Sequence, residues 1–272
     1  MNWKKAEVEQ NNLMRKRINP VNLDTISQEW DIVGPARQVA IESGKDISLS
    51  RVTGPCIIEN LREIKHNHII DVGCGTGFLS SKLATIADEC WGIDSSKESI
   101  KLASKKYKKD NLHFVCSSIK EYKSDISFDA CIANMVFMDD PEWTDSLNNI
   151  IKLLSPDGKL LMTITHPCFW PQYWGYQDEN WFNYLEEIFI QGSFSITLEK
   201  NIGTTTHIHR PLSKYISVLL SRGLVIEKLI ELQSSTDSTP SGIHFPRFIF
   251  IQAGKITKKP TNEETICYSV SP

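Results

Sequence analysis

A short glycine-rich segment has the residue types to bind a ligand through its backbone. Residues 71–77 read Asp-Val-Gly-Cys-Gly-Thr-Gly, and they follow the apolar run His68-Ile69-Ile70. The glycines at 73, 75 and 77 permit positive φ angles and let a ligand approach the main chain where any Cβ would block it. Asp71 opens the segment at the carboxyl end of a predicted strand, where open α/β sheets bind their ligands.

The spacing of these glycines bears on which ligand they suit. The pattern is G-x-G-x-G, whereas the dinucleotide fingerprint G-x-G-x-x-G would need a small residue at 78, where the helix packs on the strand. Phe78 occupies that position. An acid about 20 residues beyond the glycines would also suit the ribose of a nicotinamide dinucleotide, so a dehydrogenase stays open as an alternative. The sequence shows no group of Lys, Tyr or His residues suited to hydride transfer, which argues against this alternative.

Further polar residues follow the next predicted strands. Asp94 ends Trp91-Gly92-Ile93-Asp94, and its carboxylate suits ribose hydroxyls through charge-assisted hydrogen bonds. Ser118 follows a third strand and can accept a hydrogen bond from an amino group. Asn134 ends a fourth strand, where it either faces a ligand or caps the strand end.

These motifs together resemble the class I S-adenosylmethionine (AdoMet) methyltransferases. The segment Ala133-Asn134-Met135-Val136-Phe137-Met138-Asp139-Asp140 is similar to the corresponding motif of a large bacterial branch of that family. The resemblance covers residues 50–165 well and the C-terminal strands moderately, although the family often has Asp at the position of Ser118. It implies AdoMet as the cofactor. The cofactor-binding residues that it implies are Asp71, Gly73, Cys74, Gly75, Gly77, Asp94, Ser95, Ser118, Ile119, Asn134 and Met135.

Two histidines are candidates for the methyl-acceptor side. Methyl transfer is an in-line displacement, so the protein must align the nucleophile and remove a proton from a hydroxyl or a protonated amine. His166, in "HPCF", ends the fifth predicted strand, and His209, in "HRPLS", introduces the last large helix; both motifs again resemble the bacterial branch. We expect His166 first and His209 second as general base or acceptor-positioning group. The alternatives are backbone bonding at the strand end for His166 and packing at the helix start for His209. His207 would share a strand face with His209, but no third ligand is near, so no metal site is expected.

An aromatic-rich stretch separates the two histidines. It either covers one end of the sheet as core or forms a lid that desolvates the methyl group and holds an apolar or amphipathic acceptor. Its density of aromatic residues favours the lid. Trp181 and Tyr184, three apart on a predicted helix, would share a face. The expected substrate-binding residues are Asp139, Phe169, Trp181, Tyr184 and Arg210.

The elements that must position these residues alternate between helix and strand from about residue 50. This pattern predicts the α/β class with a doubly wound, mostly parallel sheet, and the family resemblance implies seven strands with an antiparallel C-terminal strand. Helices are expected at 52–64, 78–87, 96–107, 142–154 and 212–222. Strands are expected at 68–72, 90–94, 113–116, 128–134, 159–165, 225–232 and 245–253, with a turn at 155–158 and a polar loop at 233–242.

The chain divides into a methyltransferase domain and two flanking segments. Residues 51–255 form the expected domain, with residues 167–210 as the aromatic-rich lid. Residues 1–50 form an expected helical cover, with Trp30 and Gly34-Pro35-Ala36-Arg37 as landmarks, and residues 256–272 a polar tail. We expect both the cover and the lid to be mobile over the acceptor.

Composition argues against several partners. Thirty Lys and Arg against 33 Asp and Glu give a net charge of −3, so nothing in the overall charge favours nucleic acid or an anionic membrane. A lysine cluster after Asp94 would suit RNA, but a solvated helix face explains it as well. We see no signal peptide and no apolar run near the roughly 18 residues of a membrane helix. Seven cysteines without a CxxC pair are typical of reduced thiols, so a cytoplasmic protein is expected.

The sequence thus predicts an AdoMet-dependent methyltransferase (EC 2.1.1 type) that acts on a small-molecule acceptor, with a secondary metabolite or a peptide-like precursor as the expected class. An NAD(P)-dependent oxidoreductase is the rival from another enzyme class. An AdoMet-binding protein without catalysis is the non-enzyme rival, and an RNA methyltransferase is less favoured. The acceptor atom (O, N, C or S) and the oligomeric state do not follow from the sequence.

Overall fold

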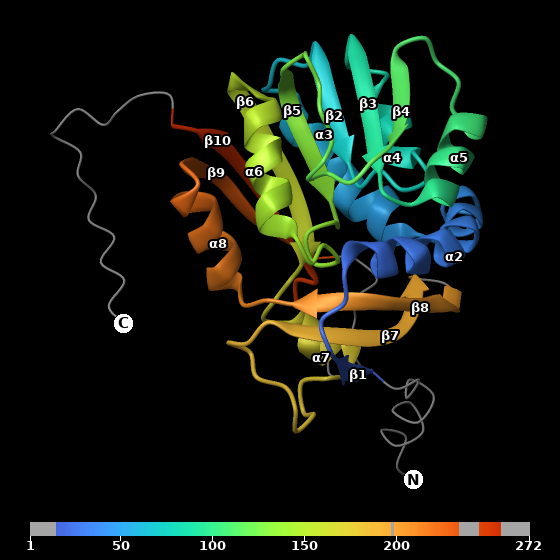
Figure 1. Cartoon of the computed structure of the whole chain (residues 1–272), viewed down its shortest axis with the longest axis vertical. Helices are drawn as coiled ribbons and strands as arrows, with labels where there is room; N and C mark the ends of the chain where they lie inside the picture. Colours follow the sequence, from blue (N-terminus) through green and yellow to red (C-terminus); the bar gives the residue numbers. More distant parts are fainter. Residues whose placement is uncertain (1–14, 197–198, 234–244, 257–272) are drawn as a thin grey trace, which may run out of the picture.

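The larger part of the molecule is a seven-stranded sheet in the order β4-β3-β2-β5-β6-β10-β9 (Figure 1). The computed structural model describes residues 15–196, 199–233 and 245–256. Five strands are parallel, and β10 runs antiparallel to both β6 and β9, so the predicted sheet is confirmed. The strands are β2 (His68–Val72), β3 (Glu89–Asp94), β4 (Leu112–Cys116), β5 (Phe128–Asn134), β6 (Leu154–Thr165), β9 (Leu224–Leu232) and β10 (Phe248–Lys255).

Helices cover both faces of this sheet because its strands alternate their apolar side chains between the two faces. Ile69 of β2 packs with Ile57 and Leu83 on one face, and Ile70 packs with Leu147 and Leu219 on the other. The first face carries α3 (Gly54–Leu61) and α4 (Phe78–Leu83), and the second carries α6 (Trp143–Leu153) and α8 (Leu212–Ser221). Helix α5 (Lys97–Lys106) packs against β3 and β4.

Most expected boundaries agree with the structure to within a few residues. Helix α4 ends at Leu83 rather than residue 87, and the π-helical turn η1 (Ser48–Thr53) precedes α3. Strand β6 begins at Leu154, but its register with β5 jumps from Leu154 to Lys159, so the expected turn residues 155–158 bulge out of the pairing. The expected strand at 245 begins only at Phe248. The expected loop 233–242 and the polar tail lie almost entirely outside the described residues.

A second, smaller sheet differs from the sequence prediction. β1 (Lys16–Ile18), β7 (Ile188–Ile196) and β8 (Glu199–His209) form an antiparallel sheet in the order β1-β7-β8. We expected the N-terminal segment to be helical; it contains the long helix α2 (Leu23–Glu42), preceded by strand β1. We also expected the stretch 167–210 to contain a helix around Trp181. Instead, one short helix, α7 (Trp170–Trp174), precedes the hairpin β7–β8, and residues 177–187 form turns without helix or strand.

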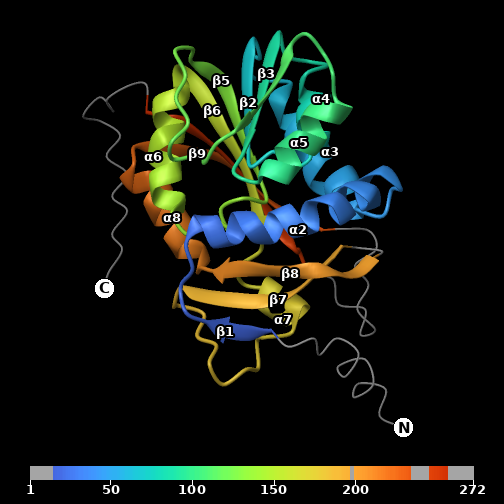
Figure 2. The ribbon, with the colours of Figure 1, turned by 45° about the vertical axis from the view of Figure 1, so that its right-hand side comes forward.

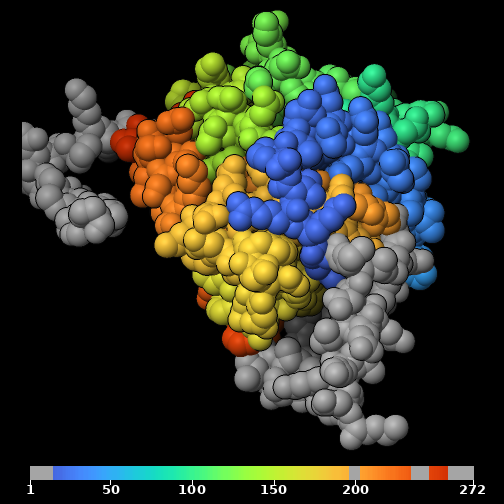
Figure 3. Space-filling view, turned by 60° about the horizontal axis from the view of Figure 1, so that its bottom comes forward, coloured from blue at the N-terminus to red at the C-terminus, as the bar shows by residue number. Residues whose placement is uncertain are grey.

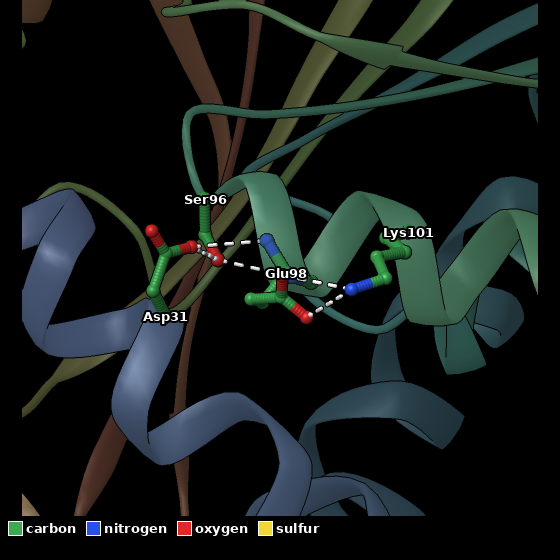
Figure 4. A network of polar contacts seen from close by, with 5 residues as sticks. Asp31, Ser96, Glu98 and Lys101 are labelled. Carbon is green, nitrogen blue, oxygen red and sulfur yellow. Dashed lines mark hydrogen bonds and ion pairs between the residues drawn. The ribbon is translucent and has the colours of Figure 1, made fainter.

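Helix α2 (Leu23–Glu42) lies between the small sheet and the main sheet (Figure 2). Glu29 on α2 accepts hydrogen bonds from the Thr206 backbone N at 2.7 Å and from its Oγ1 at 2.9 Å. At the other side of α2, the Asp31 carboxylate accepts from Ser96 Oγ at 2.7 Å and from the Glu98 backbone N at 3.0 Å, at the start of α5 (Figure 4). The helix is therefore fixed to both parts of the molecule.

The described N-terminal residues from 15 onward and residues 167–196, blue and yellow in the space-filling view, lie side by side at one end of the molecule (Figure 3). Their joint position follows from the β1–β7 pairing and from the α2–β8 contacts. The Ile208 backbone N also donates to the Met138 carbonyl at 2.7 Å, which attaches β8 to the loop after β5. Both segments thus face the carboxyl ends of the parallel strands, and the mobility of this cover stays a prediction.

Candidate cofactor and acceptor site

The three glycines of the turn after β2 differ in what surrounds them. All three have positive φ, and Gly77 precedes α4 in the left-handed conformation. A Cβ at Gly73 would lie 2.6 Å from the Val136 side chain, and one at Gly77 would lie 2.6 Å from Phe114, so packing forbids both. A Cβ at Gly75 would meet only Arg37 Nη1, at 3.9 Å. Gly75 is thus the glycine that leaves its backbone open for a ligand.

A cavity lies between this turn and α2. Its floor is the end of β2 and the start of α4, and its roof carries Arg37 from α2. The predicted cofactor residues Asp71, Gly73, Cys74 and Asn134 line it, which brings together residues from two separate predicted motifs. The full lining is Arg37, Ile41, Leu49, Asp71, Gly73, Cys74, Thr76, Phe78, Leu79 and Asn134.

Asp94, at the end of β3, turns its carboxylate toward the glycine turn. Its Oδ2 accepts from the Gly75 backbone N at 2.8 Å, and its Oδ1 accepts from the Ser96 backbone N at 2.8 Å. Burial raises the pKa of Asp94, although both backbone donors and the Arg37 guanidinium oppose that rise. Ser95, beside it, shares a 2.7 Å hydrogen bond with Ser27 of α2.

Asp71, at the end of β2, is a buried carboxyl that fixes the start of α4. Its Oδ2 accepts from Ser80 Oγ at 2.6 Å. Burial raises the pKa of Asp71 to about 7, with the Ser80 hydrogen bond opposing the rise and the Asp94 charge adding to it. Asp71 therefore exchanges a proton near neutral pH directly below the cavity.

The raised pKa of Asp71 predicts a pH dependence of stability. Because the folded protein binds this proton more tightly than the unfolded chain, the contribution of Asp71 to the free energy of unfolding falls as pH rises from about 4 to about 7. Asp71→Asn should therefore flatten that fall, measured by urea unfolding at pH 5 and pH 8. The exposed Asp88→Asn serves as the control and should leave the pH dependence unchanged. An equal pH dependence in wild type and Asp71→Asn would contradict the assignment.

Asn134 ends β5 beside the cavity, and Met135 follows it in the chain. Asn134 Oδ1 accepts from Thr163 Oγ1 at 2.8 Å. Met135 has a φ of 58° and is the one residue other than glycine with a positive φ in the described part of the chain. Its backbone N donates to the Thr163 carbonyl at 3.0 Å, which holds the unusual conformation. Strained backbone of this kind is concentrated at functional sites.

The residues expected near an adenine have other partners. Ser118 Oγ pairs with Glu121 Oε2 at 3.2 Å and accepts from the Glu121 backbone N at 3.3 Å. Ile119 is buried in the core between β5 and α6. Their predicted role at the adenine stays a prediction.

Arg37 is the functional candidate that sequence reasoning missed. Its Nε is buried and donates no hydrogen bond within the described residues, and Asp46 Oδ2 lies 3.6 Å away. The charge of the same guanidinium opposes the rise that burial causes in the pKa of Asp94 and of Asp139, so it lies within electrostatic reach of both carboxyls. Only the Gly34-Pro35-Ala36-Arg37 landmark marked this region, and nothing in the sequence placed α2 above the glycine turn.

His166 holds a turn rather than facing the cofactor cavity. Its Nε2 lies 2.8 Å from Glu231 Oε1 on β9, and its Nδ1 accepts from the Cys168 backbone N at 3.2 Å. The side chain is 2% exposed. These contacts fit the alternative role of a strand-end histidine bonded to backbone, and its catalytic role stays an untested prediction.

His209 likewise has both ring nitrogens occupied. Nδ1 lies 3.3 Å from Tyr176 Oη and Nε2 lies 3.0 Å from the Tyr184 carbonyl. Burial lowers the pKa of His209 to about 4, and the Tyr184 carbonyl opposes that change. The ring is therefore neutral and packed among aromatic side chains, next to the start of α8.

The aromatic side chains expected to bind substrate contact other parts of the protein. Trp181 stacks on Tyr176, whereas the Tyr184 hydroxyl accepts from the Leu212 backbone N at 3.0 Å at the start of α8. Phe169 stacks on Phe245 and lies tilted against His166. The prediction that Trp181 and Tyr184 share a helix face was wrong, because the chain turns at Asn183, whose side chain accepts from the Leu185 backbone N.

Arg210 is buried and bonded to the loop after β5. Its Nη1 donates to the Phe137 carbonyl at 2.6 Å, its Nη2 to the Asp140 carbonyl at 2.9 Å, and its Nε to Glu187 Oε2 at 2.5 Å. These contacts occupy both ends of the guanidinium. Arg210 therefore holds the loop that carries Asp139, and its predicted substrate contact stays untested.

Two negative findings apply to the described residues alone. Within them, no three His, Cys, Asp or Glu side chains come together as metal ligands. No described helix is long and apolar enough to cross a bilayer.

Solved structures with the same fold are methyltransferases. A S-adenosylmethionine-dependent methyltransferase from Clostridium acetobutylicum superposes with a TM-score of 0.60 at 17% identity, over 81% of this chain and 99% of that chain. The DhpI–SAM–HEP complex superposes with a TM-score of 0.58 at 14% identity, over 87% and 99%. At these identities the likeness shows the fold alone.

Sequence comparisons identify a methyltransferase domain in the chain. Residues 64–186 match the family model described as a methyltransferase domain. The chain is 33% identical over 101 residues to malonyl-[acyl-carrier protein] O-methyltransferase of Priestia megaterium, which covers 35% of each chain. It is 33% identical over 139 residues to the O-methyltransferase rstn1 of Aspergillus nomiae, over 48% of this chain. The chain therefore contains a methyltransferase domain, on the fold of AdoMet-dependent methyltransferases.

The match to these methyltransferases is partial. It spans 35% of the Priestia protein and 58% of the Aspergillus protein. Their named substrates are therefore no evidence of the acceptor of this methyltransferase. The matches to methyltransferases nevertheless support AdoMet as the cofactor, in agreement with the ligand inferred from the sequence motifs.

Proposed function

We propose that this methyltransferase transfers the methyl group of AdoMet to an oxygen atom of a small-molecule acceptor. The observation that carries the proposal is the open backbone at Gly75, bonded to the Asp94 carboxylate on one side and roofed by Arg37 on the other. An oxygen acceptor is favoured because the relatives named above are O-methyltransferases. A Coxiella burnetii relative, 31% identical over 117 residues, is also an O-methyltransferase, of ubiquinone biosynthesis.

The residues around the cavity fit AdoMet. The cradle at Gly75 is one that a Cβ would fill. Among the described residues the buried Arg37 Nε has only the Asp46 carboxylate near it, at 3.6 Å and without a hydrogen bond, so a ligand carboxylate would supply the missing acceptor. Asp94 would accept hydrogen bonds from the ribose hydroxyls, Gly73 to Gly75 would line the amino-acid tail, and Asn134 would adjoin the methionine moiety. When bound, AdoMet supplies a methyl group on a positively charged sulfur that is an excellent leaving group.

The chain itself must then exclude water and align the acceptor. Helix α2 and the hairpin β7–β8 cover the carboxyl ends of the strands, and Glu29 and Asp31 hold α2 in place. Entry of an acceptor then requires this cover to open, which agrees with the lid expected from the aromatic stretch.

Binding and turnover test the proposal separately. Isothermal titration should show uptake of S-adenosylhomocysteine and none of NAD; NAD binding alone would instead favour the oxidoreductase. Incubation with labelled AdoMet and metabolite extracts, read by mass spectrometry, should then show a product heavier by one CH2 unit. Cofactor binding without any methylated product across broad extracts would favour the non-catalytic AdoMet-binding protein.

Arg37→Gln should weaken S-adenosylhomocysteine binding by about 10- to 100-fold, because a buried charge-assisted pair with the carboxylate is lost. Binding of 5′-methylthioadenosine, which lacks the amino-acid tail, should stay within about twofold of wild type. The exposed Arg51→Gln is the matched control and should change neither affinity. Equal losses for both ligands would show that Arg37 shapes the cavity instead of recognising the carboxylate.

A further inference from the structure

A carboxyl and an imidazole face each other beside the cofactor cavity. Asp139 Oδ1, from the loop after β5, lies 3.8 Å from His207 Nδ1 on β8. The Asp139 side chain is 16% exposed and that of His207 is 8% exposed. Neither group was predicted as a base from the sequence, because Asp139 was expected to bind substrate and His207 was considered only as a metal ligand.

The surrounding structure fixes both partners. Ile208, next to His207, donates its backbone N to the Met138 carbonyl next to Asp139. Arg210 donates to the carbonyls of Phe137 and Asp140, which flank the same short turn. The pair is therefore held by backbone contacts on both sides, the arrangement that a positioned proton acceptor needs.

The loop that carries Asp139 follows Asn134, which lines the cofactor cavity. Asp139 follows Asn134 and the strained Met135 in the same loop. Arg37 lines the cavity and acts electrostatically on Asp139 as it does on Asp94. Asp139 therefore lies within electrostatic reach of the guanidinium that would hold the tail of AdoMet.

The electrostatic surroundings suit proton transfer near neutral pH. Burial raises the pKa of Asp139 to about 8, against the opposing charges of Arg37 on α2 and Arg210 at the end of β8. Burial and Arg210 lower the pKa of His207 to about 3, so its ring is neutral. Two further titratable groups act on the pair: His209 on β8 interacts electrostatically with His207, and Tyr215 on α8 with Asp139.

Aromatic side chains surround the imidazole. Trp174 packs edge-on to His207 with ring centroids 5.3 Å apart, and Trp170 lies at 6.2 Å. Trp170 Nε1 is buried and donates no hydrogen bond within the described residues. Trp170 and His207 line one narrow recess, together with Thr165, Pro167, Tyr176, Ile208, His209, Arg210 and Tyr215. Flat aromatic acceptors pack well against such rings.

We propose that Asp139 is the general base of this methyltransferase, that His207 is its positioning residue, and that the acceptor is a phenolic hydroxyl. The inference rests on the proposed O-methyl transfer. The phenolic proton moves to an Asp139 carboxylate oxygen while an oxygen lone pair forms the O–CH3 bond. The S–CH3 bond breaks, its electron pair stays on sulfur as S-adenosylhomocysteine, and Asp139 later releases the proton to water. A carboxylate acceptor would need no base.

Asp139→Asn tests the base with a panel of phenols and catechols. Its kcat with an unactivated phenol should fall by about 100-fold or more, because general base catalysis typically contributes that much. Turnover of 4-nitrophenol, which is ionised at the assay pH, should stay within about fivefold of wild type, since no proton has to be removed. Affinity for S-adenosylhomocysteine should be unchanged. The exposed Asp145→Asn is the control and should match wild type with both acceptors.

The pH profile separates the two partners of the pair. Wild-type kcat should rise with pH through about 8. Asp139→Asn should lose this rise in kcat. His207→Gln should shift the pH at which kcat rises while retaining measurable turnover. Equal loss with 4-nitrophenol and with unactivated phenols would overturn Asp139 as the base. Methylation of carboxylic acids but of no phenol would overturn the acceptor class and leave the proposed O-methyl transfer intact. Cofactor binding with no methylated product at all would refute the proposed function itself.

Discussion

Replacing Gly75 with alanine is expected to weaken S-adenosylhomocysteine binding on the order of 100-fold, about 2.7 kcal/mol, because the added methyl group would occupy the cradle of the amino-acid tail. Packing alone tolerates this Cβ, since its nearest neighbour would be Arg37 Nη1 at 3.9 Å. The positive φ of 55° costs roughly 1–2 kcal/mol of stability for a residue with a side chain. Titration calorimetry and urea unfolding measure the two effects on the same sample.

Gly44→Ala provides the matched control for this substitution. Gly44 also has a positive φ, of 73°, and no atom lies within 4 Å of the Cβ that it would gain. Both variants should therefore lose similar stability, and only Gly75→Ala should lose cofactor affinity. Similar affinities for the two variants would show that the cofactor does not bind against Gly75.

Arg210→Met should produce the largest loss of stability, about 2–6 kcal/mol in the free energy of unfolding, because two buried backbone carbonyls lose their hydrogen-bond donor. The substitution would leave the Phe137 and Asp140 carbonyls without their donor, and each unsatisfied buried group costs about 1–3 kcal/mol. Glu187 adds less to this loss, because its side chain is 42% exposed and can be solvated. Urea unfolding at neutral pH gives the measurement.

Arg17→Met is a suitable comparison for Arg210. Arg17 pairs with Glu186 on the same cover, but both side chains are about half exposed, at 47% and 48%. Exposed pairs contribute little to stability, so this variant should unfold much like wild type. If Arg210→Met unfolded like Arg17→Met, the loop of Asp139 would have to be held by something other than the Arg210 guanidinium.

Most of the main sheet could be predicted because its signals are local. The run His68-Ile69-Ile70 followed by the glycine turn determines strand, turn and helix within a few residues. The register of a parallel sheet then brings the ends of β2, β3 and β5 to one edge. For this reason Asp71, Gly73 and Asn134 were correctly expected to lie together.

The cover could not be predicted because its contacts join distant parts of the chain. β1 pairs with β7 across most of the sequence, and Glu29 is bonded to Thr206. The stretch around β7 and β8 carries Gly192 and Gly203 and many aromatics, which obscured the two-residue periodicity of its strands. The positions of Arg37 and His207 depend on these pairings, so the site was incomplete from sequence alone.

The same limit explains the histidines. A histidine at a strand end, such as His166, is a reasonable catalytic candidate when only its neighbours in sequence are known. Its actual partner, Glu231, lies on the edge strand β9, which is separated from the strand of His166 by β10. The acceptor side of the site therefore depends on the tertiary fold more than the cofactor side does.

A crystal structure of the complex with S-adenosylhomocysteine tests the placement of the cofactor most directly. The ribose hydroxyls should lie within about 3 Å of the Asp94 carboxylate, and the amino-acid tail should lie against Gly73 to Gly75 with its carboxylate at Arg37. A ligand bound elsewhere in the molecule, or a ribose whose hydroxyls make no contact with Asp94, would contradict it.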